Sequence, residues 1–349
     1  MSSISLHNVT KAYGKDIVIE NLNLEIRDGS FTVLIGPSGC GKSTTLRMIT
    51  GLDAPTSGDV LLDGQRVNEV APGKRDISMV FQNYALYPTM TVEENIEFGL
   101  INKKVPAEER KRRIREVCEV VGLTEYLRRK PANLSGGQRQ RVALARAMVK
   151  KPKVFMMDEP LSNLDAKLRA QMRVELINMH KRMGTTFVYV THDQVEAMSM
   201  ADDIVLMDKG KIVQQCGPRE LYHNPNSIYT AQFVGSPQTN IWDGQLPDGM
   251  KLGFRPERVK LRAIDPAKGI NIPARVQTKE VLGAEIIYSM DTPFGVIMCK
   301  SEEEIDGNSA LTVSVAFDSM YLFGADTLRL PFAPAAQAAV AAVYGGDRA

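Results

Sequence analysis

A glycine-rich loop between an apolar run and a helical pattern is the feature that most restricts the fold of this chain. Residues 36–44 read GPSGCGKST, which fits G-x-x-x-x-G-K-[ST], and they follow the apolar run Phe31–Ile35. Glycines in such a loop allow backbone N–H groups to turn inward onto phosphate oxygens, and the N-terminus of the following helix adds its positive end. Lys42 would reach the outer phosphates, and the Ser43 hydroxyl would ligate Mg²⁺. The strand before the loop and the helix after it disfavour a chance glycine-rich turn.

Further apolar runs predict the rest of an α/β domain. Strands that are covered on both faces need no alternation of polar and apolar residues, and such runs are typical of parallel sheets. Asp63-Gly64 and Lys209-Gly210 indicate β-hairpin turns. A three-layer α/β domain ending near Gly235 is therefore expected. Its further strands are predicted at residues 154–157, 186–190 and 204–207, and its helices by the apolar stripes Ile114, Val117, Cys118 and Val121 (after Pro106) and Leu168, Met172, Leu176, Met179 and Met183.

The sequence pattern changes after Gly235. Helical periodicity fades and short alternating segments appear, separated by Pro, Gly and Asp turns, which predicts a small all-β barrel or sandwich. A chain of 349 residues is also too long for one ordinary core. Two domains are expected, at residues 1–235 and 236–349, and the Ala-rich tail at 333–343 is either a short helix or frayed. The expected strands of the second domain are residues 259–262, 274–278, 286–290, 295–299 and 311–317.

Charge and cysteine usage argue against several classes of protein. The net charge of +2 provides no global attraction toward nucleic acid or anionic lipid. The four cysteines lie far apart and form no CxxC pair, which argues against a structural zinc site or a disulfide framework and fits a reducing cytosol. No apolar run is long enough to span a bilayer. Any membrane association is therefore expected to go through a partner.

Two carboxylates and a histidine stand at predicted strand ends. Asp158 and Glu159 directly follow the run at 154–157, on the expected neighbour of the phosphate-loop strand. Asp158 would hold Mg²⁺ through its water shell, and Glu159 would orient the attacking water, because phosphoryl transfer needs chiefly positioning and charge compensation. A lone histidine is more often structural. His192, however, follows the run at 186–190 at the carboxyl edge of an open α/β sheet, where ligands bind.

The segment LSGGQ at 134–138 resembles a second phosphate-binding loop, which we call the second cradle. Ser135, Gly136 and Gly137 open onto a helical pattern at 142–149, although the chain already has a complete phosphate loop about a hundred residues earlier. A merely capped helix would explain Ser135, but we expect it to explain neither the paired glycines nor Gln138.

Together these motifs resemble those of the ATP-binding cassette (ABC) ATPases, the motor subunits of ABC transporters. The resemblance covers residues 3–235 and implies a P-loop NTPase fold with a helical subdomain, with ATP and Mg²⁺ as ligands. It also implies that each ATP lies between two chains, so that the second cradle serves the site of a partner copy. Tyr13 would stack on adenine, Gln82 would contact Mg²⁺ and report occupancy, and Asp165 would couple the two sites. A core aromatic is the alternative for Tyr13, and a polar loop residue for Gln82.

The complete set of expected site residues follows from the motifs and the resemblance. Catalytic residues would be Lys42, Gln82, Glu159 and His192, and Mg²⁺ would be held by Ser43, Gln82 and Asp158. ATP would be bound by Tyr13, Gly36, Ser38, Gly39, Gly41, Lys42, Ser43 and Thr44, and from the partner chain by Ser135, Gly136, Gly137, Gln138 and Asp165.

Three further segments resemble one group within the family. EPLSNLDAKLR, GSPQTNIWDG and LGFRPERVKL are similar to segments of the maltose, oligosaccharide and glycerol-phosphate importer ATPases. Those proteins carry a C-terminal regulatory β-barrel of the oligomer-binding fold. Thr239 stands where members often have Met or a similar apolar residue, so regulatory contacts do not transfer automatically. Importers of polyamine, iron or thiosulfate share much of this layout and stay as alternatives.

The resemblance also implies partners and location. We expect a homodimer closed by ATP, two integral-membrane permease subunits, indirectly a solute-binding protein, and a cytoplasmic place at the inner face of the membrane. Residues 83–100, with the helix from Pro106, would grip a permease helix through Tyr84, Leu86 and Tyr87, unless these three are core. A DNA-associated ATPase with the same head is disfavoured, because the interval between the two cradles is compact and has no heptad run. No nucleic-acid partner is expected.

Overall fold

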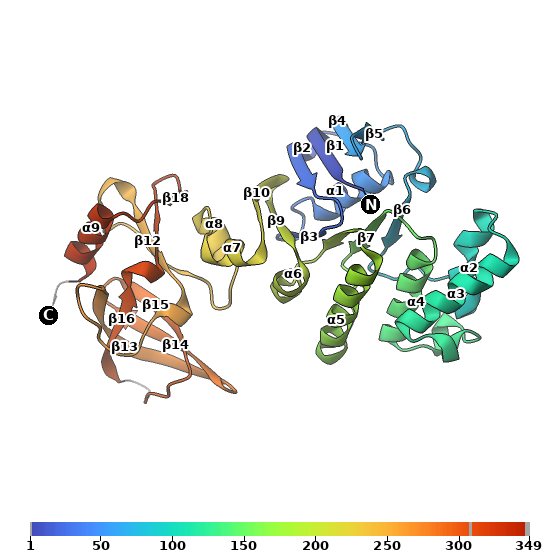
Figure 1. The fold of residues 1–349 in the computed structure, drawn as a ribbon. Coiled ribbons are helices and arrows are strands. Elements are labelled where there is room, and N and C mark those ends of the chain that lie inside the picture. Colours follow the sequence, from blue (N-terminus) through green and yellow to red (C-terminus); the bar gives the residue numbers. More distant parts are fainter. Residues whose placement is uncertain (1, 307–308, 346–349) are drawn as a thin grey trace. The chain divides into compact units, whose positions relative to one another are not determined.

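The described residues group into two compact units. The computed structural model describes residues 2–306 and 309–345, and these fall into the units Met1–Pro218 and Arg219–Ala349 (Figure 1). The division comes earlier in the chain than Gly235, where the sequence pattern changes. The segment between the two positions contains helices α7 (Pro218–His223) and α8 (Ile228–Phe233), which group with the C-terminal unit.

A six-stranded sheet forms the centre of the first unit. Its order is β10-β9-β3-β8-β7-β6, and all neighbouring pairs are parallel except the β9–β10 hairpin. The four predicted apolar strands and the turn at Lys209-Gly210 are confirmed. One expectation is wrong: β8 lies between β3 and β7, so the strand that ends at Asp158 does not neighbour the phosphate-loop strand. The strands are β3 (Phe31–Ile35), β6 (Ile77–Val80), β7 (Val154–Asp158), β8 (Thr186–Val190), β9 (Asp203–Asp208) and β10 (Lys211–Cys216).

A second sheet and one helix share a core with the central sheet. This antiparallel sheet has the order β2-β1-β4-β5, and the sequence pattern did not predict its first two strands. Helix α1 (Lys42–Thr50) follows the phosphate loop, and its Leu46 and Ile49 belong to one hydrophobic core with residues of both sheets. The phosphate loop is therefore anchored at the centre of the unit. The strands are β1 (Ile4–Tyr13), β2 (Asp16–Ile26), β4 (Ser57–Leu62) and β5 (Gln65–Arg66).

Helices complete the first unit in two places. Helix α5 (Ala166–Met183) packs on the central sheet through His180, whose ring lies 4.9 Å from that of Phe187, and α6 (Gln194–Met200) packs on β3. The other three helices, α2 (Val92–Asn102), α3 (Ala107–Val121) and α4 (Gly136–Met148), contact one another and form a helical group (Figure 1). Both predicted apolar stripes are confirmed in part: Ile114, Cys118 and Val121 of the first and Met172, Leu176 and Met179 of the second are buried, whereas Val117, Leu168 and Met183 are half-buried.

Two four-stranded antiparallel sheets build the second unit. Their orders are β11-β12-β17-β18 and β15-β14-β13-β16, and both contribute to one hydrophobic core. Residues 259–262 are not a strand: Pro256 begins a 3₁₀ turn just before them, and only Lys260 bridges to Ser314. The Ala-rich tail is a helix, α9 (Pro334–Tyr344), with Tyr344 packed on Trp242. The strands are β11 (Asn240–Trp242), β12 (Lys251–Phe254), β13 (Gly269–Leu282), β14 (Glu285–Thr292), β15 (Gly295–Ser301), β16 (Ala310–Ala316), β17 (Met320–Phe323) and β18 (Arg329–Leu330).

A buried arginine explains why α7 and α8 belong to the second unit. The Arg255 guanidinium donates to the backbone carbonyls of Tyr222, Ala231 and Val234, and it lies 4.1 Å from the centre of the Tyr222 ring. These carbonyls are near the ends of the two helices, where a helix leaves acceptors unsatisfied. Arg255, which directly follows β12, therefore fastens both helices to the sheet.

Candidate functional site

The phosphate loop has a backbone that requires glycine at its start. Gly36 has φ 152°, and a β-carbon there would lie 2.2 Å from the Met207 carbonyl oxygen. Gly39 and Gly41 also have positive φ, and the space beside Gly39 is open. Helix α1 begins at Lys42 without a side-chain cap and without an acidic residue in its first turn. Its first N–H groups and its positive end therefore face no competing carboxylate from that turn.

Four predicted ATP-binding side chains, Ser38, Lys42, Ser43 and Thr44, occupy this loop and the first turn of α1. The Lys42 ammonium lies across the loop and donates to the carbonyl oxygens of Gly36 and Pro37, both at 2.8 Å. An ammonium has three donors and no acceptor. The two carbonyls use two of these donors, and the third, which lies 3.7 Å from the weak acceptor Cys40 Sγ, would serve a phosphate. Ser38 is exposed, and Thr44 is half-buried.

Ser43 and Asp158 bring α1 and the end of β7 together. The Ser43 hydroxyl donates to Asp158 Oδ1 at 2.8 Å. Burial raises the pKa of the Asp158 carboxyl, and the negative charge of Glu159 adds to the rise, despite the hydrogen bond from Ser43. A divalent cation would relieve both effects, because it supplies the positive charge that favours the carboxylate.

Two predicted catalytic side chains, Gln82 and His192, contact one carboxylate oxygen of a third, Glu159. His192 Nδ1 lies 3.2 Å from Glu159 Oε2, and the Gln82 amide nitrogen donates to the same oxygen at 3.5 Å and to Ser162 Oγ at 3.3 Å. The Glu159 N–H donates to the Val190 carbonyl at the end of β8. Since Asp158 precedes Glu159 directly, the structure brings Gln82, Glu159 and His192 together beside the Ser43–Asp158 pair.

Tyr13 is at the surface rather than in the core. Its side chain is 46% exposed, its hydroxyl donates to Asp53 Oδ2, and the Lys11 ammonium lies 4.6 Å from the ring centre. Lys11 in turn donates to Asp53 Oδ1 at 2.6 Å. The core alternative for Tyr13 is wrong. Lys11 and Asp53 hold this side chain, and no motif in the sequence pointed to either of them.

The second cradle is also a helix cap. Ser135 Oγ accepts from the Gln138 N–H at 3.3 Å, while the Gln138 side chain accepts from the Ser135 N–H at 2.9 Å, which is a capping box. A β-carbon at Gly137 would lie 2.7 Å from Leu168 Cδ2. The expectation that a capped helix explains neither Gln138 nor the glycines is therefore wrong for Gln138 and Gly137. Packing does not require glycine at 136, because the heavy atom nearest to an added β-carbon would lie 3.5 Å from it.

The two cradles are carried by different parts of the first unit. Helix α4, which Ser135 caps, packs on α2, α3 and β6, whereas the phosphate loop precedes α1. Asp165 likewise caps α5 and accepts from the Leu168 N–H at 2.9 Å. The residues expected to act on a partner's nucleotide thus have local structural roles in their own chain.

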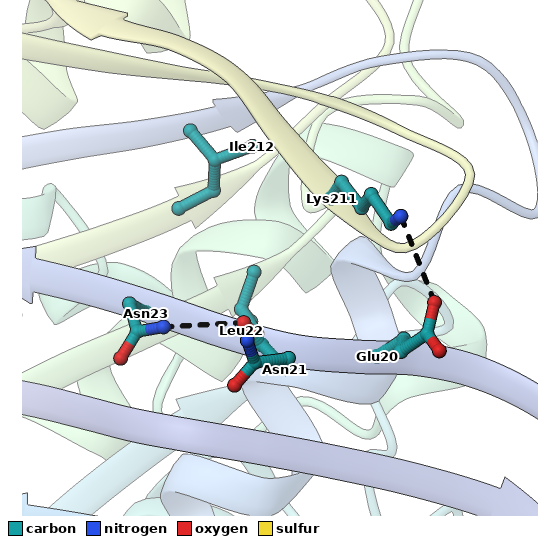
Figure 2. Close-up of a pocket in the computed structure, with 6 residues that line it drawn as sticks. All are labelled: Glu20, Asn21, Leu22, Asn23, Lys211 and Ile212. Atoms are coloured by element: carbon teal, nitrogen blue, oxygen red, sulfur yellow. Dashed lines mark hydrogen bonds and ion pairs between the residues drawn. The ribbon is translucent and has the colours of Figure 1, made fainter.

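A hollow on the first unit does not coincide with these residues. A cavity of about 520 Å³ lies between β2 and β10 and is lined by Glu20, Asn21, Leu22, Asn23, Lys211 and Ile212 (Figure 2). Figure 2 shows Lys211 paired with Glu20, at 3.6 Å. None of these residues was predicted for the site. A loop that binds phosphate through backbone N–H groups needs no deep pocket.

Two properties of residues 2–306 and 309–345 bear on metals and membranes. They contain no group of three or more His, Cys, Asp or Glu side chains placed to hold a metal ion. Mg²⁺ held by one carboxylate, one hydroxyl and phosphate oxygens is compatible with this, since Mg²⁺ is usually bound by few protein ligands. None of their helices combines the length and the apolar character needed to cross a bilayer.

Comparison with known proteins decides the family. A family model described as "ABC transporter" matches residues 19–162. The oligosaccharides import ATP-binding protein MsmX of Bacillus subtilis (strain 168) is 45% identical to this chain, over 94% of the chain and 99% of MsmX. The chain belongs to the ABC transporter family. This ABC ATPase is also similar to the sn-glycerol-3-phosphate import ATP-binding protein UgpC of Brucella abortus (strain 2308), with 46% identity over 95% of the chain and 99% of UgpC.

A solved structure resembles part of this ABC ATPase. The ATP-binding cassette MJ0796, solved as a dimer in a post-hydrolysis state with ADP and phosphate, matches with a TM-score of 0.56 and 36% identity. The match covers 62% of this chain and 99% of MJ0796. The fold of an ATP-binding cassette is thereby shown for the matched part of the chain.

Proposed function

We propose that this chain is the ATP-hydrolysing motor subunit of an ABC importer, and that it drives uptake of a carbohydrate or a related solute through separate permease subunits. The convergence of Gln82 and His192 on Glu159, beside the Ser43–Asp158 pair, is the observation that carries the hydrolytic part. Similarity to import ATP-binding proteins over nearly the whole chain supports the importer part. Importers of polyamine, iron or thiosulfate are the alternative within the family.

Each side chain of the site has one task in this proposal. The N–H groups of residues 36–44 and the Lys42 ammonium bind the phosphates of ATP. Ser43 and Asp158, with Gln82, hold Mg²⁺, whose charge compensates that of the phosphates. Glu159 accepts a hydrogen bond from the attacking water and so orients it, and His192 donates to the γ-phosphate while it contacts Glu159.

We propose further that two copies close over each ATP. The capping box of α4 uses the Gln138 N–H group but not those of Gly136 and Gly137. The first N–H groups of a helix have no acceptor inside the helix, so these two remain available to an anion. The cap and an anion site are therefore compatible at the same helix end. Asp165 would approach the same nucleotide. The dimer of MJ0796 supports this assembly.

A groove in the helical group is our candidate for the permease contact, at the inner face of the membrane. A hollow of about 260 Å³ is lined by Tyr87 and Phe98, whose rings lie 4.8 Å apart, and by Arg146 and Lys150. No residue of α3 lines this described hollow, so the expected contribution of the helix from Pro106 to the permease contact stays a prediction. Burial lowers the pKa of Lys150, and the positive charges of Arg146 and Lys103 add to this. The groove therefore favours a partner helix with an apolar face and a carboxylate.

The three residues expected to contact a permease differ in how far their side chains are exposed. Tyr84 is buried, so the core alternative holds for it, and its carbonyl accepts from Arg146. Leu86 is half-buried, whereas Tyr87 is 39% exposed and stays a candidate contact.

We assign the C-terminal unit a regulatory role and the oligomer-binding fold on resemblance. Its two antiparallel sheets around one core are compatible with a closed barrel. The Thr239 hydroxyl is buried and donates to the Ala231 carbonyl at 2.5 Å. Thr239 therefore serves the packing of α8 and is no candidate for a regulatory contact.

Reconstitution tests the proposal. The chain is co-expressed with candidate permease pairs, and the complex is placed in vesicles. Solute uptake is then measured with ATP for the unchanged complex and for a complex that carries Glu159→Gln. ATP-driven uptake of a sugar or sugar-like solute supports the proposal, and uptake of a polyamine, iron or thiosulfate instead selects the alternative. ATP hydrolysis that responds to DNA and to no permease would overturn the importer assignment in favour of a DNA-associated ATPase.

A further inference from the structure

Arg169 joins two loops that belong to different parts of the site. It stands in the first turn of α5, and its guanidinium donates to the Leu164 carbonyl oxygen at 3.1 Å and to Asp193 Oδ2 at 3.2 Å. Leu164 directly precedes Asp165, and Asp193 directly follows His192. One side chain therefore connects the segment expected to face the partner's nucleotide with the segment that carries His192 in the same chain.

The Asp193 end of this connection is rigidly built. Asp193 Oδ1 accepts from the Val195 and Glu196 N–H groups at 2.7 and 3.1 Å, which caps α6. Glu196 is buried, accepts from Tyr189 and Thr191 hydroxyls at 2.8 and 2.7 Å, and lies 3.9 Å from Arg169 Nε. Loop 191–193 is thus tied to β8 and α6 on one side and to Arg169 on the other.

The Leu164 end is tied within its own segment and to Gln82, because the Ser162 hydroxyl donates to the Glu159 carbonyl at 2.9 Å and the Asn163 amide donates to the Gln82 carbonyl at 3.0 Å. The Leu164 N–H donates to the Leu161 carbonyl, and Asp165 caps α5 through the Leu168 N–H. A displacement of residues 161–165 would change the two contacts of Arg169 together, because a guanidinium is a planar fork with fixed donor directions. A lysine has no such fork and cannot maintain both contacts in the same geometry.

We propose that Arg169 is a positioning residue, which transmits movement of residues 161–165 to His192. Contact of Asp165 with the partner's site would in this way adjust the histidine beside Glu159 in its own site. The proposal rests on the proposed roles of Asp165 and His192. Arg169 itself touches neither nucleotide nor water in this arrangement and is not a catalytic residue.

The transmission is measurable in a single chain. The protein contains four histidines, so ring NMR signals of a histidine-labelled sample are few, and His192→Gln assigns the one of interest. Asp165→Ala removes the α5 cap at the far end, and the displacement of the His192 signal is recorded at constant pH. We expect a clear displacement in the otherwise unchanged chain and its loss in the Arg169→Met background.

Controls separate transmission from folding and from the proposed function. Arg173→Met removes a charge one turn later on α5 and should preserve the displacement; Arg169→Lys replaces Arg169→Met if the latter does not fold, and should lose it. An equal displacement with and without Arg169, or none in the unchanged chain, overturns the proposal. ATP hydrolysis that depends on Glu159 but not on Asp165 would instead refute the assumed role of Asp165, whatever the NMR result for Arg169.

Discussion

Glu159 has a left-handed backbone that is unusual for a residue other than glycine. Its φ is 44°, and its N–H is held by the Val190 carbonyl at the end of β8. Such a conformation costs on the order of 1–3 kcal/mol and persists where the surroundings enforce it, which is common at functional sites. Here it accompanies a carboxylate that both Gln82 and His192 contact.

Replacement of Glu159 by Gln tests the role of this carboxylate. The amide retains the size of the side chain but accepts a proton far less readily, so we expect Mg-ATP binding to persist and turnover to fall about 100-fold or more. The ATP-bound dimer should accumulate. Steady-state hydrolysis and sedimentation measure the two effects, and near-normal hydrolysis would remove Glu159 from the catalytic role.

Cys40 lies in the phosphate loop, but its side chain belongs to the hydrophobic core beneath it. Burial raises the pKa of this thiol, although the nearby Lys42 ammonium opposes the rise. The reactive form of cysteine is the thiolate. The pKa of the Cys40 thiol is therefore higher in the folded chain than in the unfolded chain. The protonated thiol stabilises the fold at every pH below the ordinary thiol pKa, and this stabilisation is lost as the pH rises through the folded-state pKa.

Alkylation of Cys40 should therefore be slow at neutral pH. We expect iodoacetamide to label it in the folded chain at least about 10-fold more slowly than in the unfolded chain, with the difference narrowing at alkaline pH. Peptide-resolved mass spectrometry distinguishes it from Cys118 and Cys299, whose pKa values burial raises to about 12. Fast labelling at pH 7 without unfolding would show that the thiol is accessible.

Labelled protein should hydrolyse ATP more slowly than unlabelled protein, and the activity of a Cys40→Ser variant should be insensitive to the reagent.

At the scale of elements, local patterns predicted strands but not their order. The apolar runs of β3, β7, β8 and β9 were recognisable because both faces of each strand are covered. Their order depends on crossover connections through α5 and the helical group, which the runs themselves do not encode. For this reason β8 was not expected between the phosphate-loop strand and the strand that ends at Asp158.

The antiparallel sheet of the first unit and the helix caps were harder to predict than the central sheet. Strands β1 and β2 alternate imperfectly, because bulges shift their register at several positions. In α4, Gln138 was attributed to nucleotide binding alone, since a capping box and an anion site use the same residue types at the same helix end. The nucleotide motifs were predictable because their spacing is local. Asp53 and Arg169 act through contacts between distant segments and had no local signature.

At the scale of the whole molecule, the position of α7 and α8 decides where the chain can be cut. A truncation after Gly217 should remain soluble, melt cooperatively and bind ATP, because the predicted ATP-binding residues of its own chain all precede the cut. A truncation after Gly235 retains both helices without Arg255, which donates to three of their carbonyls, and it exposes Ala231, which packs with Tyr321 and Phe323. We expect the longer fragment to aggregate more and to melt at a lower temperature.

Light scattering and thermal denaturation compare the two fragments, with nucleotide binding as a check on each. A longer fragment as stable as the shorter one would show that Arg255 contributes little. A folded shorter fragment that does not bind nucleotide would show that the first unit is not an independent nucleotide-binding domain.

The sharing of one ATP by two chains can be tested by mixing two defective proteins. Lys42→Ala damages the phosphate loop, and Ser135→Arg damages the second cradle. Each homodimer then has two defective sites, whereas a mixed dimer gathers both lesions in one site and leaves the other intact. On a Glu159→Gln background, ATP should therefore produce dimers in the mixture and in neither protein alone, as measured by sedimentation. Charge-assisted hydrogen bonds to a γ-phosphate in a site closed from water are strong enough for one intact site to favour closure.

The helix cap requires its own control in this experiment. Loss of Ser135 as the α4 cap costs about 1 kcal/mol, so Ser135→Arg could act by destabilising α4 rather than by blocking a nucleotide. Ser135→Thr retains a capping hydroxyl, and Ser135→Ala removes it without adding bulk. Both should dimerise with ATP better than Ser135→Arg if steric access to the phosphate matters, and Ser135→Ala should show the lower melting temperature of the two. If the Ser135→Arg protein dimerises normally by itself, Ser135 caps α4 and does nothing for a partner's ATP.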